Sequence, residues 1–339
     1  MKKNTIRKNM IIMVLVIVMA AAAGCSTSDS KGTSGGGAKK KEEKKGMDIK
    51  ATIEEQVLAE KDGVKVTATG LGSDDENSFY INIKAENDTE NVYQMRIDRI
   101  TVNGFCMMES TQVDEPIMPG ETETKLSIWS MTAKYMNMGE PGEIKIYNAR
   151  LLEAEEKKDE ELAEALGEEE HVYYSPKEGQ MENPFFMSEE ITIQTSAYDE
   201  MKVTLPEGEK LYDENGIQLI RIDADKEDRE EGFCDIFFLK NDSSDVIYLG
   251  AKDGSVNDFM LDDLGVSIIY ASSTVSPGET AVMAAAVDKY TLQYLMNTEE
   301  DVKIESLECT LYLMKIVEVE EWGSGSEEIA EIPYSYTAE

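Results

Sequence analysis

The stretch Asp62-Gly63-Val64-Lys65-Val66-Thr67-Ala68 decides how the rest of this chain is interpreted, because a related stretch, Asn215-Gly216-Ile217-Gln218-Leu219-Ile220-Arg221, follows in its second half. Each begins with a turn-forming pair and continues with alternating apolar and polar residues. Asp-Gly and Asn-Gly supply the positive φ angles of the type I′ hairpin turn, and alternation with a period of two is typical of a strand with one buried face. The two stretches therefore predict a β-hairpin at the start of two related segments.

Further motif pairs follow in the same order and extend this repeat over most of the chain. They combine turn residues with short runs of Val, Ile, Tyr and Phe, a pattern that predicts antiparallel β-sandwiches. One short helix per copy is expected as well, in the second copy at residues 287–296. Because the repeated positions have turn chemistry, the repeat predicts a scaffold and does not by itself indicate a site. The pairs are Asn87-Asp88-Thr89 with Asn241-Asp242-Ser243, Val102-Asn103-Gly104-Phe105 with Val256-Asn257-Asp258-Phe259, Pro119-Gly120-Glu121-Thr122 with Pro277-Gly278-Glu279-Thr280, Lys134-Tyr135 with Lys289-Tyr290, Ile144-Lys145-Ile146 with Val302-Lys303-Ile304, and Ser188-Glu189-Glu190-Ile191 with Ser326-Glu327-Glu328-Ile329.

The first copy carries an insertion at about residues 153–186. Its first part, Glu153 to Glu170, is dense in glutamate with sparse Leu and Ala, which predicts an acidic helix with one thin apolar stripe. Four aromatic residues follow, and they either line a groove that binds a glycan or a peptide, or pin a long loop to its own domain. These are Tyr173, Tyr174, Phe185 and Phe186.

The first 46 residues have the order of a secretion signal followed by a tether. Basic residues precede an apolar run, Met10–Ala23, that is too short to span a bilayer, since spanning takes about 20 residues. The small residues before Cys25 resemble the lipobox of bacterial lipoproteins, with Ala22 where Leu is usual. The resemblance implies a lipid on Cys25; a cleaved signal peptide without lipid is the alternative. The expected organisation is a signal peptide (1–24), a lipidated cysteine and flexible tether (25–46), and two β-sandwich repeats (47–200 and 201–339).

The charge of the chain limits its partners. The 339 residues include 33 basic and 69 acidic side chains, a net charge of −36. Nucleic-acid binding depends on Lys and Arg at phosphates, so this balance excludes it. Cations, basic peptides and neutral glycans stay compatible with the charge, which also serves to keep a surface protein soluble.

Catalytic motifs are lacking. His171 is the one histidine, and no nucleophile elbow, phosphate loop or dinucleotide fingerprint occurs. A hydrolase that uses two carboxylates stays open, because that chemistry needs only two acids at about 5 to 10 Å.

Two acidic stretches occupy matching places in the two copies. Asp74 and Asp75 belong to the first, and Asp223 and Asp225 to the second. Oxygen ligands concentrated in a loop suit calcium, whereas solvated loops have the same composition. Calcium is the one cofactor that the sequence suggests.

Three cysteines follow the predicted lipidation site. Cys234 and Cys309 fall on candidate strands of the same repeat, whereas Cys106 lies in the other. An odd number cannot all pair within one chain. Cys234 and Cys309 form either a disulfide or two buried thiols.

Taken together, the hairpin pair, the Asn-Asp turn, Val-Asn-Gly-Phe, Pro-Gly-Glu-Thr and the final Ser-Glu-Glu-Ile segment resemble the immunoglobulin-like repeats in lipoproteins of Gram-positive anaerobic bacteria. The resemblance implies a mainly β protein with two tandem immunoglobulin-like antiparallel sandwiches, and it carries no catalytic residues. We expect a non-enzymatic lipoprotein on the extracellular face of the cell membrane, held by its lipid, that binds a surface protein, peptide or glycan or acts as a scaffold. A structural spacer and a carboxylate-based envelope hydrolase are the alternatives.

Overall fold

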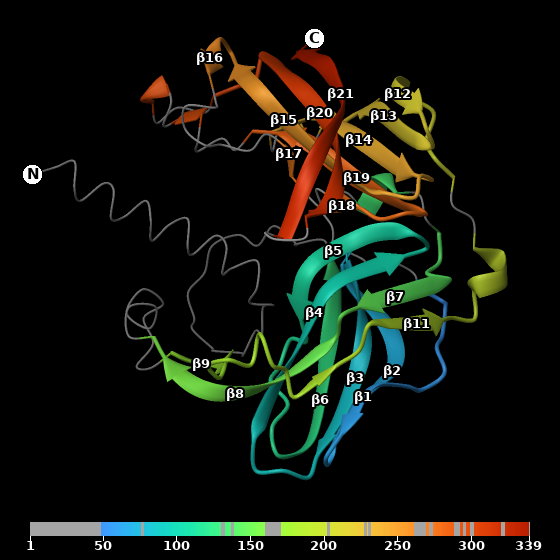
Figure 1. The fold of residues 1–339 in the computed structure, drawn as a ribbon, viewed down its shortest axis with the longest axis vertical. Helices are drawn as coiled ribbons and strands as arrows, with labels where there is room; N and C mark the ends of the chain where they lie inside the picture. Colours follow the sequence, from blue (N-terminus) through green and yellow to red (C-terminus); the bar gives the residue numbers. More distant parts are fainter. Residues whose placement is uncertain are drawn as a thin grey trace, which may run out of the picture. The chain divides into compact units, whose positions relative to one another are not determined.

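The computed structural model describes residues 49–338, apart from short gaps at 76–77, 130–132, 137–138, 160–170, 202–203, 227–228, 230–231, 261–268, 271–273, 288–291, 294–295, 299–301 and 320–322. The predicted signal peptide, Cys25 and the tether lie outside the described residues. The chain from Lys45 to Glu339 forms one compact unit. This unit is mainly β, which confirms the predicted class at that level (Figure 1).

The strands of the first half are β1 (Gln56–Lys61), β2 (Val64–Asp75), β3 (Ser78–Asn87), β4 (Val92–Val102), β5 (Phe105–Gln112), β6 (Gly120–Trp129), β7 (Glu143–Tyr147), β8 (Arg150–Lys158), β9 (Val172–Pro176), β10 (Phe186–Met187) and β11 (Glu190–Gln194). Those of the second half are β12 (Glu209–Glu214), β13 (Ile217–Asp223), β14 (Phe233–Asn241), β15 (Val246–Val256), β16 (Phe259–Met260), β17 (Ile269–Tyr270), β18 (Thr274–Val275), β19 (Glu279–Ala286), β20 (Ser306–Val319) and β21 (Gly323–Thr337). Two 3-10 turns, η1 (Ala133–Tyr135) and η2 (Tyr198–Glu200), also lie within the described residues.

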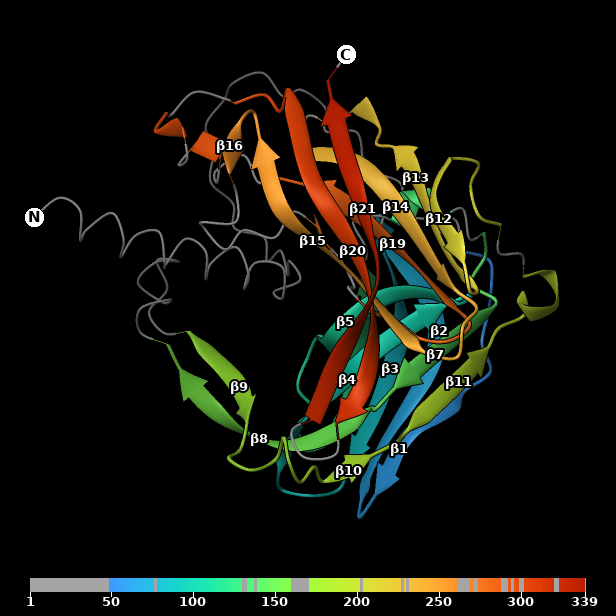
Figure 2. The same cartoon turned by 45° about the horizontal axis from the view of Figure 1, so that its top comes forward.

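These strands form three sheets. A four-stranded sheet has the order β1-β2-β3-β6, and a five-stranded sheet has the order β16-β15-β20-β21 with β18 beside β15. Between them a twelve-stranded sheet follows the path β10-β8-β4-β5-β19-β14-β13-β12. The pairing of β5 with β19 is parallel, whereas the other pairings between described strands are antiparallel. Through this parallel pair, one sheet continues from the first half of the chain into the second (Figure 2).

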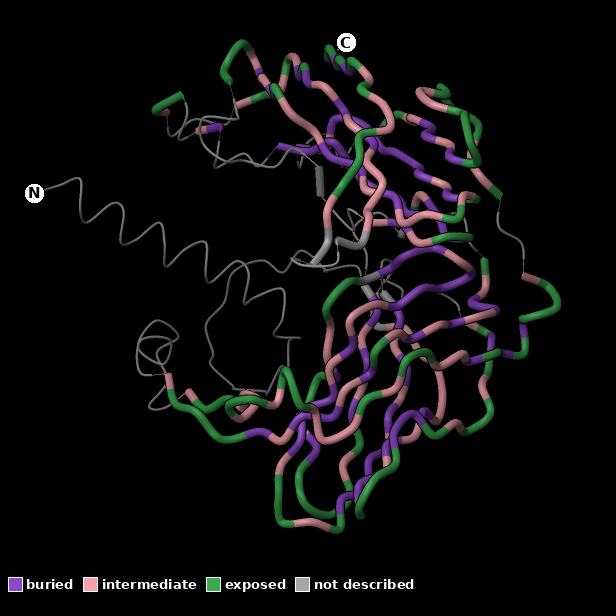
Figure 3. Tube along the Cα trace, viewed as in Figure 1, coloured by how far each residue is buried: buried purple, intermediate pink, exposed green. Residues whose placement is uncertain are grey.

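Each half encloses an apolar core between two layers, but the first core extends into the second half. It contains Ile81 and Met95 from its own sheets together with Ile236, Phe238 and Val282 from β14 and β19. Alternate residues of the same two strands, such as Phe237, belong to the second core. Both faces of β14 and β19 are therefore buried, which the continuous buried segments of Figure 3 show. The two halves share buried apolar surface as well as a sheet.

The turn motifs adopt the predicted geometry in both halves. Asp62 and Gly63 have φ of 44° and 88°, and Asn215 and Gly216 have φ of 53° and 80°. Positive φ at both central residues is the signature of the type I′ turn. Asp258, which stands where the first half has glycine, also has a positive φ, 67°. That substitution leaves the turn type unchanged.

Buried asparagines brace equivalent loops in the two halves. Asn87 Nδ2 donates to the carbonyls of Asn91 and Ile117, and Asn241 Nδ2 donates to those of Asp245 and Val275. Each Oδ1 accepts the amide N–H two residues later, at distances of 3.0 Å. A buried amide that satisfies several backbone groups fixes a loop more firmly than a turn dipeptide does.

Two of the predicted motif matches are out of register. The amide of Glu143 donates to Asn103 Oδ1, and the amide of Ser306 donates to Asn257 Oδ1. These equivalent bonds align Glu143 with Ser306. The next residue, Ile144, therefore corresponds to Leu307 and not to Val302. Val302–Ile304 precede β20 and form no strand. The match of 188–191 with 326–329 is wrong for the same reason: Ile191 lies opposite Ile146 in β7, whereas Cys309, the counterpart of Ile146, lies opposite Tyr334. Short apolar–polar motifs recur by chance, and hydrogen bonds, not the motifs, set strand register.

The predicted acidic helix is wrong over its first part. Residues 153–158 belong to β8, and β9 pairs with residues 154–158 along the hairpin that extends from the sheet in Figures 1 and 2. The charged side chains suit a strand because Glu155 and Lys157, two positions apart, share one face, where they form an ion pair at 2.5 Å. Residues 160–170 lie outside the described part. No helix is found among the described residues of the stretch 287–296: Val287 is not helical, and Leu292, Gln293 and Met296 are helical only as scattered residues.

Candidate functional site

The four aromatic residues predicted to line a groove have different environments. The Phe185 ring packs on Tyr93 with centroids 4.9 Å apart, and Phe185 and Phe186 both pack against the first core. Tyr173 on β9 is exposed, and Tyr174 is half-buried with its carbonyl accepting a bond from Gln94. The two phenylalanines therefore pin their segment to the domain, which is the second of the two interpretations, and the structure does not place the four rings in one groove.

The predicted calcium ligands are engaged elsewhere or lie outside the description. Asp223 pairs with Arg229 and Asp225 with Lys134, each at 3.4 Å. Asp74 and Asp75 end strand β2 and do not lie in a loop as predicted, and their side chains are not described. Within the described residues, no three potential metal ligands gather.

The structure contains no disulfide between Cys234 and Cys309. Cys234 lies on β14 and Cys309 on β20, in the two sheets that enclose the second core, and both thiols are buried. Burial and, to a lesser extent, the adjacent Asp235 carboxylate raise the pKa of the Cys234 thiol to about 12. Of the two alternatives given for Cys234 and Cys309, the structure has two buried thiols and not a disulfide. Cys106 is a buried thiol as well.

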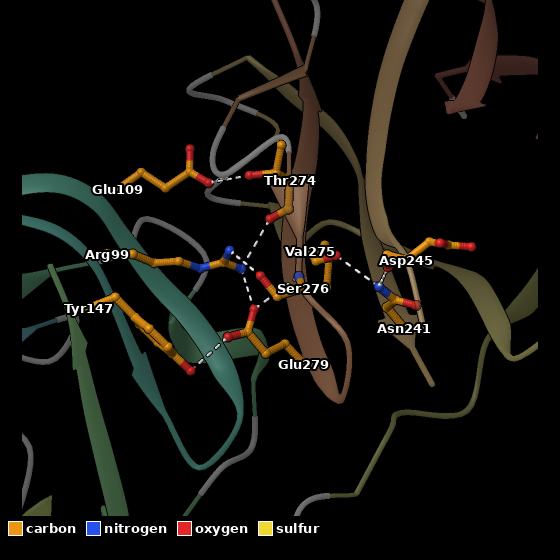
Figure 4. Close-up of polar contacts among 9 residues, drawn as sticks. All are labelled: Arg99, Glu109, Tyr147, Asn241, Asp245, Thr274, Val275, Ser276 and Glu279. Atoms are coloured by element: carbon orange, nitrogen blue, oxygen red, sulfur yellow. Dashed lines mark hydrogen bonds and ion pairs between the residues drawn. The ribbon is translucent and has the colours of Figure 1, made fainter. Parts of the chain in front are cut away.

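The most developed polar site lies where β5 meets β19, which we call the junction. Its residues come from both halves: Arg99 on β4 and Tyr147 at the end of β7 approach Ser276 and Glu279 around the start of β19 (Figure 4). The turn before β19 is closed by a bond from the amide of Glu279 to the carbonyl of Ser276 at 3.1 Å. Gly278 takes a φ of 82° in this turn, as the second central residue of a type II turn requires.

Arg99 is held by three groups of the second half. Its Nη1 donates to Ser276 Oγ at 2.8 Å, and its Nη2 donates to the Thr274 carbonyl at 3.2 Å and pairs with Glu279 Oε2. Glu279 is buried and also accepts a bond from the Ser276 amide. A buried ion pair with several supporting hydrogen bonds tolerates little displacement, so these contacts fix the position of one half against the other.

Tyr147 completes this cluster from the other side. Its hydroxyl donates to Glu279 Oε1 at 3.2 Å, and burial together with the Glu279 carboxylate raises the pKa of Tyr147 to about 12. Beside it, Thr274 Oγ1 donates to Glu109 Oε1 at 2.8 Å. An open cavity of about 480 Å³ adjoins these residues and is also lined by Asp98, Ser110 and Asn148. The tyrosine stays neutral at physiological pH and acts as a hydrogen-bond donor there.

A second buried polar cluster lies in the second half. Asp235 is fully buried, accepts bonds from Tyr334 Oη and Arg221 Nε at 2.7 Å each, and has its pKa raised by burial. The Arg221 guanidinium also lies over the Tyr334 ring, 5.4 Å from its centroid. These contacts join the facing sheets of one half, so this cluster stabilises the fold internally.

The sequence interpretation missed the arginines. The chain has six, at positions 7, 96, 99, 150, 221 and 229. The five that follow residue 46 are all partly buried and form the two clusters just described or lie beside them. Most cationic side chains of this chain are lysines, whereas arginine is rare. An arginine within a predicted strand was therefore the sequence signal for a buried polar cluster.

We compared the chain with protein-family models and with curated proteins. No protein-family model matches the chain, and no curated protein matches it. A search of the described residues for a helix with the length and apolar character of a membrane span finds none.

Proposed function

We propose that the described part of the chain is a duplicated immunoglobulin-like unit. In the second half, β13-β14-β19 and β16-β15-β20-β21 have the order of the A-B-E and C′-C-F-G strands of that fold, with β12 as an added edge strand. In the first half, β2-β3-β6 and β5-β4-β7-β11 follow the same order, with β1 added. The braces of Asn87 and Asn241, and those of Asn103 and Asn257, support the duplication because they connect equivalent elements in each half.

The function that this geometry supports best is that of a non-enzymatic, rigid scaffold on the outer face of the cell membrane, anchored through Cys25. The observation that carries the proposal is the junction. Tandem domains joined by a linker move independently, whereas here a continuous sheet, shared apolar surface and the Arg99–Glu279 pair connect the halves. Buried charges used to hold two halves together favour a mechanical role over a catalytic one.

Distance measurements between spin labels test the rigidity. Labels at Glu86→Cys and Glu327→Cys, which are exposed and lie in different halves, should give a distance distribution as narrow as the pair Glu86→Cys and Glu190→Cys within the first half. The variant Arg99→Met should broaden the first distribution and leave the second unchanged. A broad distribution between the halves of the wild type would overturn the scaffold proposal.

Metabolic labelling tests the anchor separately. Cells that express the full chain and grow with labelled palmitate should incorporate label into the wild type and none into Cys25→Ala. Cys106→Ala provides the control, because that cysteine is a buried thiol of the folded part. An unlabelled wild type, or label that persists in Cys25→Ala, would remove the anchor and leave the rigidity result unaffected.

A further inference from the structure

Three buried polar atoms without a hydrogen-bond partner among the described residues belong to neighbouring side chains. They are Gln94 Oε1, Arg96 Nε and Arg150 Nε. Gln94 and Arg96 lie two positions apart on β4 and share the face that points away from the core residues Tyr93 and Met95. Arg150 on β8 lies directly opposite Arg96. Directly opposed residues have Cβ atoms about 4.5 to 5.5 Å apart, so the three side chains are adjacent.

The two arginines create an excess of positive charge at this place. Arg150 pairs with Asp98, whereas Arg96 has no carboxylate partner among the described residues, and its Nη1 donates to Met181 Sδ at 3.8 Å. Burial and the charge of Arg150 lower the pKa of Arg96. Like charges placed opposite each other in a sheet are destabilising, and buried donors without acceptors cost further free energy. This arrangement favours a bound anion, because among the described residues Asp98 pairs with Arg150 and no carboxylate pairs with Arg96.

The side chain of Gln94 offers a hydrogen-bond acceptor to a ligand beside the two arginines. Its Nε2 donates to the Tyr174 carbonyl at 2.7 Å, which fixes the amide orientation and leaves Oε1 as an acceptor on the same face. Gln94 is 8% exposed, so solvent has little access to that oxygen. A ligand at this place therefore meets two N–H donors and one acceptor.

We propose that Gln94, Arg96 and Arg150 bind an oxyanion group, a phosphate or a carboxylate, that also carries a hydroxyl or N–H proton donor. The planar guanidinium suits both kinds of oxyanion, and hydrogen bonds between charged partners are about twice as strong as neutral ones. The net charge of the chain repels polyanions, but at physiological salt a charge is screened beyond about 8 Å, so the local pair of arginines decides the binding of a small ligand. The site does not depend on the membrane anchor or on the rigidity of the junction.

Arginine side-chain NMR tests this site directly. Because the chain has only six arginines, each Nε–H signal can be assigned by single substitution in the purified protein. Sodium phosphate, sodium sulfate and sodium acetate are titrated at constant ionic strength. Phosphate should shift the Arg96 and Arg150 signals saturably and leave that of Arg221 unchanged. Phosphate should also bind more tightly than sulfate, which at neutral pH has no proton to donate to Gln94; saturable binding of acetate would point to a carboxylate as the natural group.

Matched variants separate a site from a general charge effect. Arg96→Met should weaken phosphate binding, followed through the Arg150 signal, by at least about tenfold, the loss of one charge-assisted hydrogen bond. Lys303→Met removes the same charge from an exposed position and should change nothing. The proposal is overturned by the absence of saturable shifts with all three anions, or by undiminished phosphate binding in Arg96→Met. Equal affinity for phosphate and sulfate would remove Gln94 from the site.

Discussion

Asn241 shows how a single buried side chain specifies a loop. Its amide connects the end of β14 to the loop before β19, and its counterpart Asn87 makes the same bonds in the first half. The sequence predicted a turn at each Asn-Asp pair, because that dipeptide is local. The long-range bonds to Val275 and Ile117 were not predictable, since these residues are 34 and 30 positions away and come close only in the folded chain.

Removing this brace should destabilise the fold. Asn241→Ala removes the side-chain bonds to the Val275 carbonyl and from the Ser243 amide, and it leaves the Asp245 carbonyl with only the bond from Ser243 Oγ at 3.4 Å. The expected cost is about 1 to 3 kcal/mol in the free energy of unfolding. Urea denaturation measures the loss. The control Asn183→Ala lies on an exposed turn and should remain within about 0.5 kcal/mol of the wild type; equal values for both variants would contradict the role of the brace.

Tyr147 makes the stability of the junction depend on alkaline pH. Its pKa is about 10 in the unfolded chain and about 12 in the folded protein, so the folded state retains the proton more strongly. The contribution of Tyr147 to the free energy of unfolding is therefore fully present below pH 10 and is lost as the pH rises from 10 to 12. Because this side chain is partly solvated, the loss is about 1 kcal/mol and not the full linkage value.

Comparison with Tyr147→Phe isolates this effect. Urea unfolding at pH 9 and pH 11 should show a larger loss for the wild type than for Tyr147→Phe, because other groups such as Tyr334 titrate equally in both proteins. The same loss in the two proteins would show that Tyr147 does not titrate in this range.

At the scale of elements, the four-residue turn between β15 and β16, Val256 to Phe259, differs from the turn between β4 and β5, Val102 to Phe105, in one residue. Asp258 takes a φ of 67° where Gly104 takes 79°. The left-handed region costs an ordinary residue about 1 to 2 kcal/mol, less for Asp, and glycine nothing. Asp258→Gly should therefore raise the free energy of unfolding by about 0.5 kcal/mol, and Gly104→Ala should lower it by about 1 kcal/mol, as measured by thermal denaturation. Changes in the same direction would mean that the two turns are not equivalent.

The insertion shows where element prediction failed. A dense glutamate run predicted a helix, since helix propensity favours Glu and Lys. The chain instead places residues 153–158 in β8, because β4 and β9 on either side offer backbone partners and Leu151 reaches the core. Tertiary pairing outweighs local propensity, which differs by less than about 1 kcal/mol between such residues.

At the scale of the whole molecule, the shared core predicts cooperative unfolding. Phe238 of β14 packs in the core of the first half. Calorimetry of the purified protein should therefore show one transition, with equal calorimetric and van't Hoff enthalpies. Phe238→Ala should move the entire transition, with a loss of about 3 to 5 kcal/mol, whereas the exposed Met187→Ala should leave it in place. Two separate transitions in the wild type would contradict a single unit.

The sequence by itself determined the features that depend on neighbouring residues. Asp62-Gly63 and Asn215-Gly216 specified hairpins because few residues tolerate two positive φ angles, and alternation in β3 specified a strand with one buried face. The continuous apolar run Ile236-Phe237-Phe238-Leu239 is typical of a segment buried on both sides, but the sequence does not say against what such a run packs. Only the tertiary structure decided that the far face of β14 meets the first half, that β5 pairs with β19, and that Arg99 meets Glu279. These contacts join residues far apart in the chain, so burial and hydrogen bonding select them collectively and no local pattern records them.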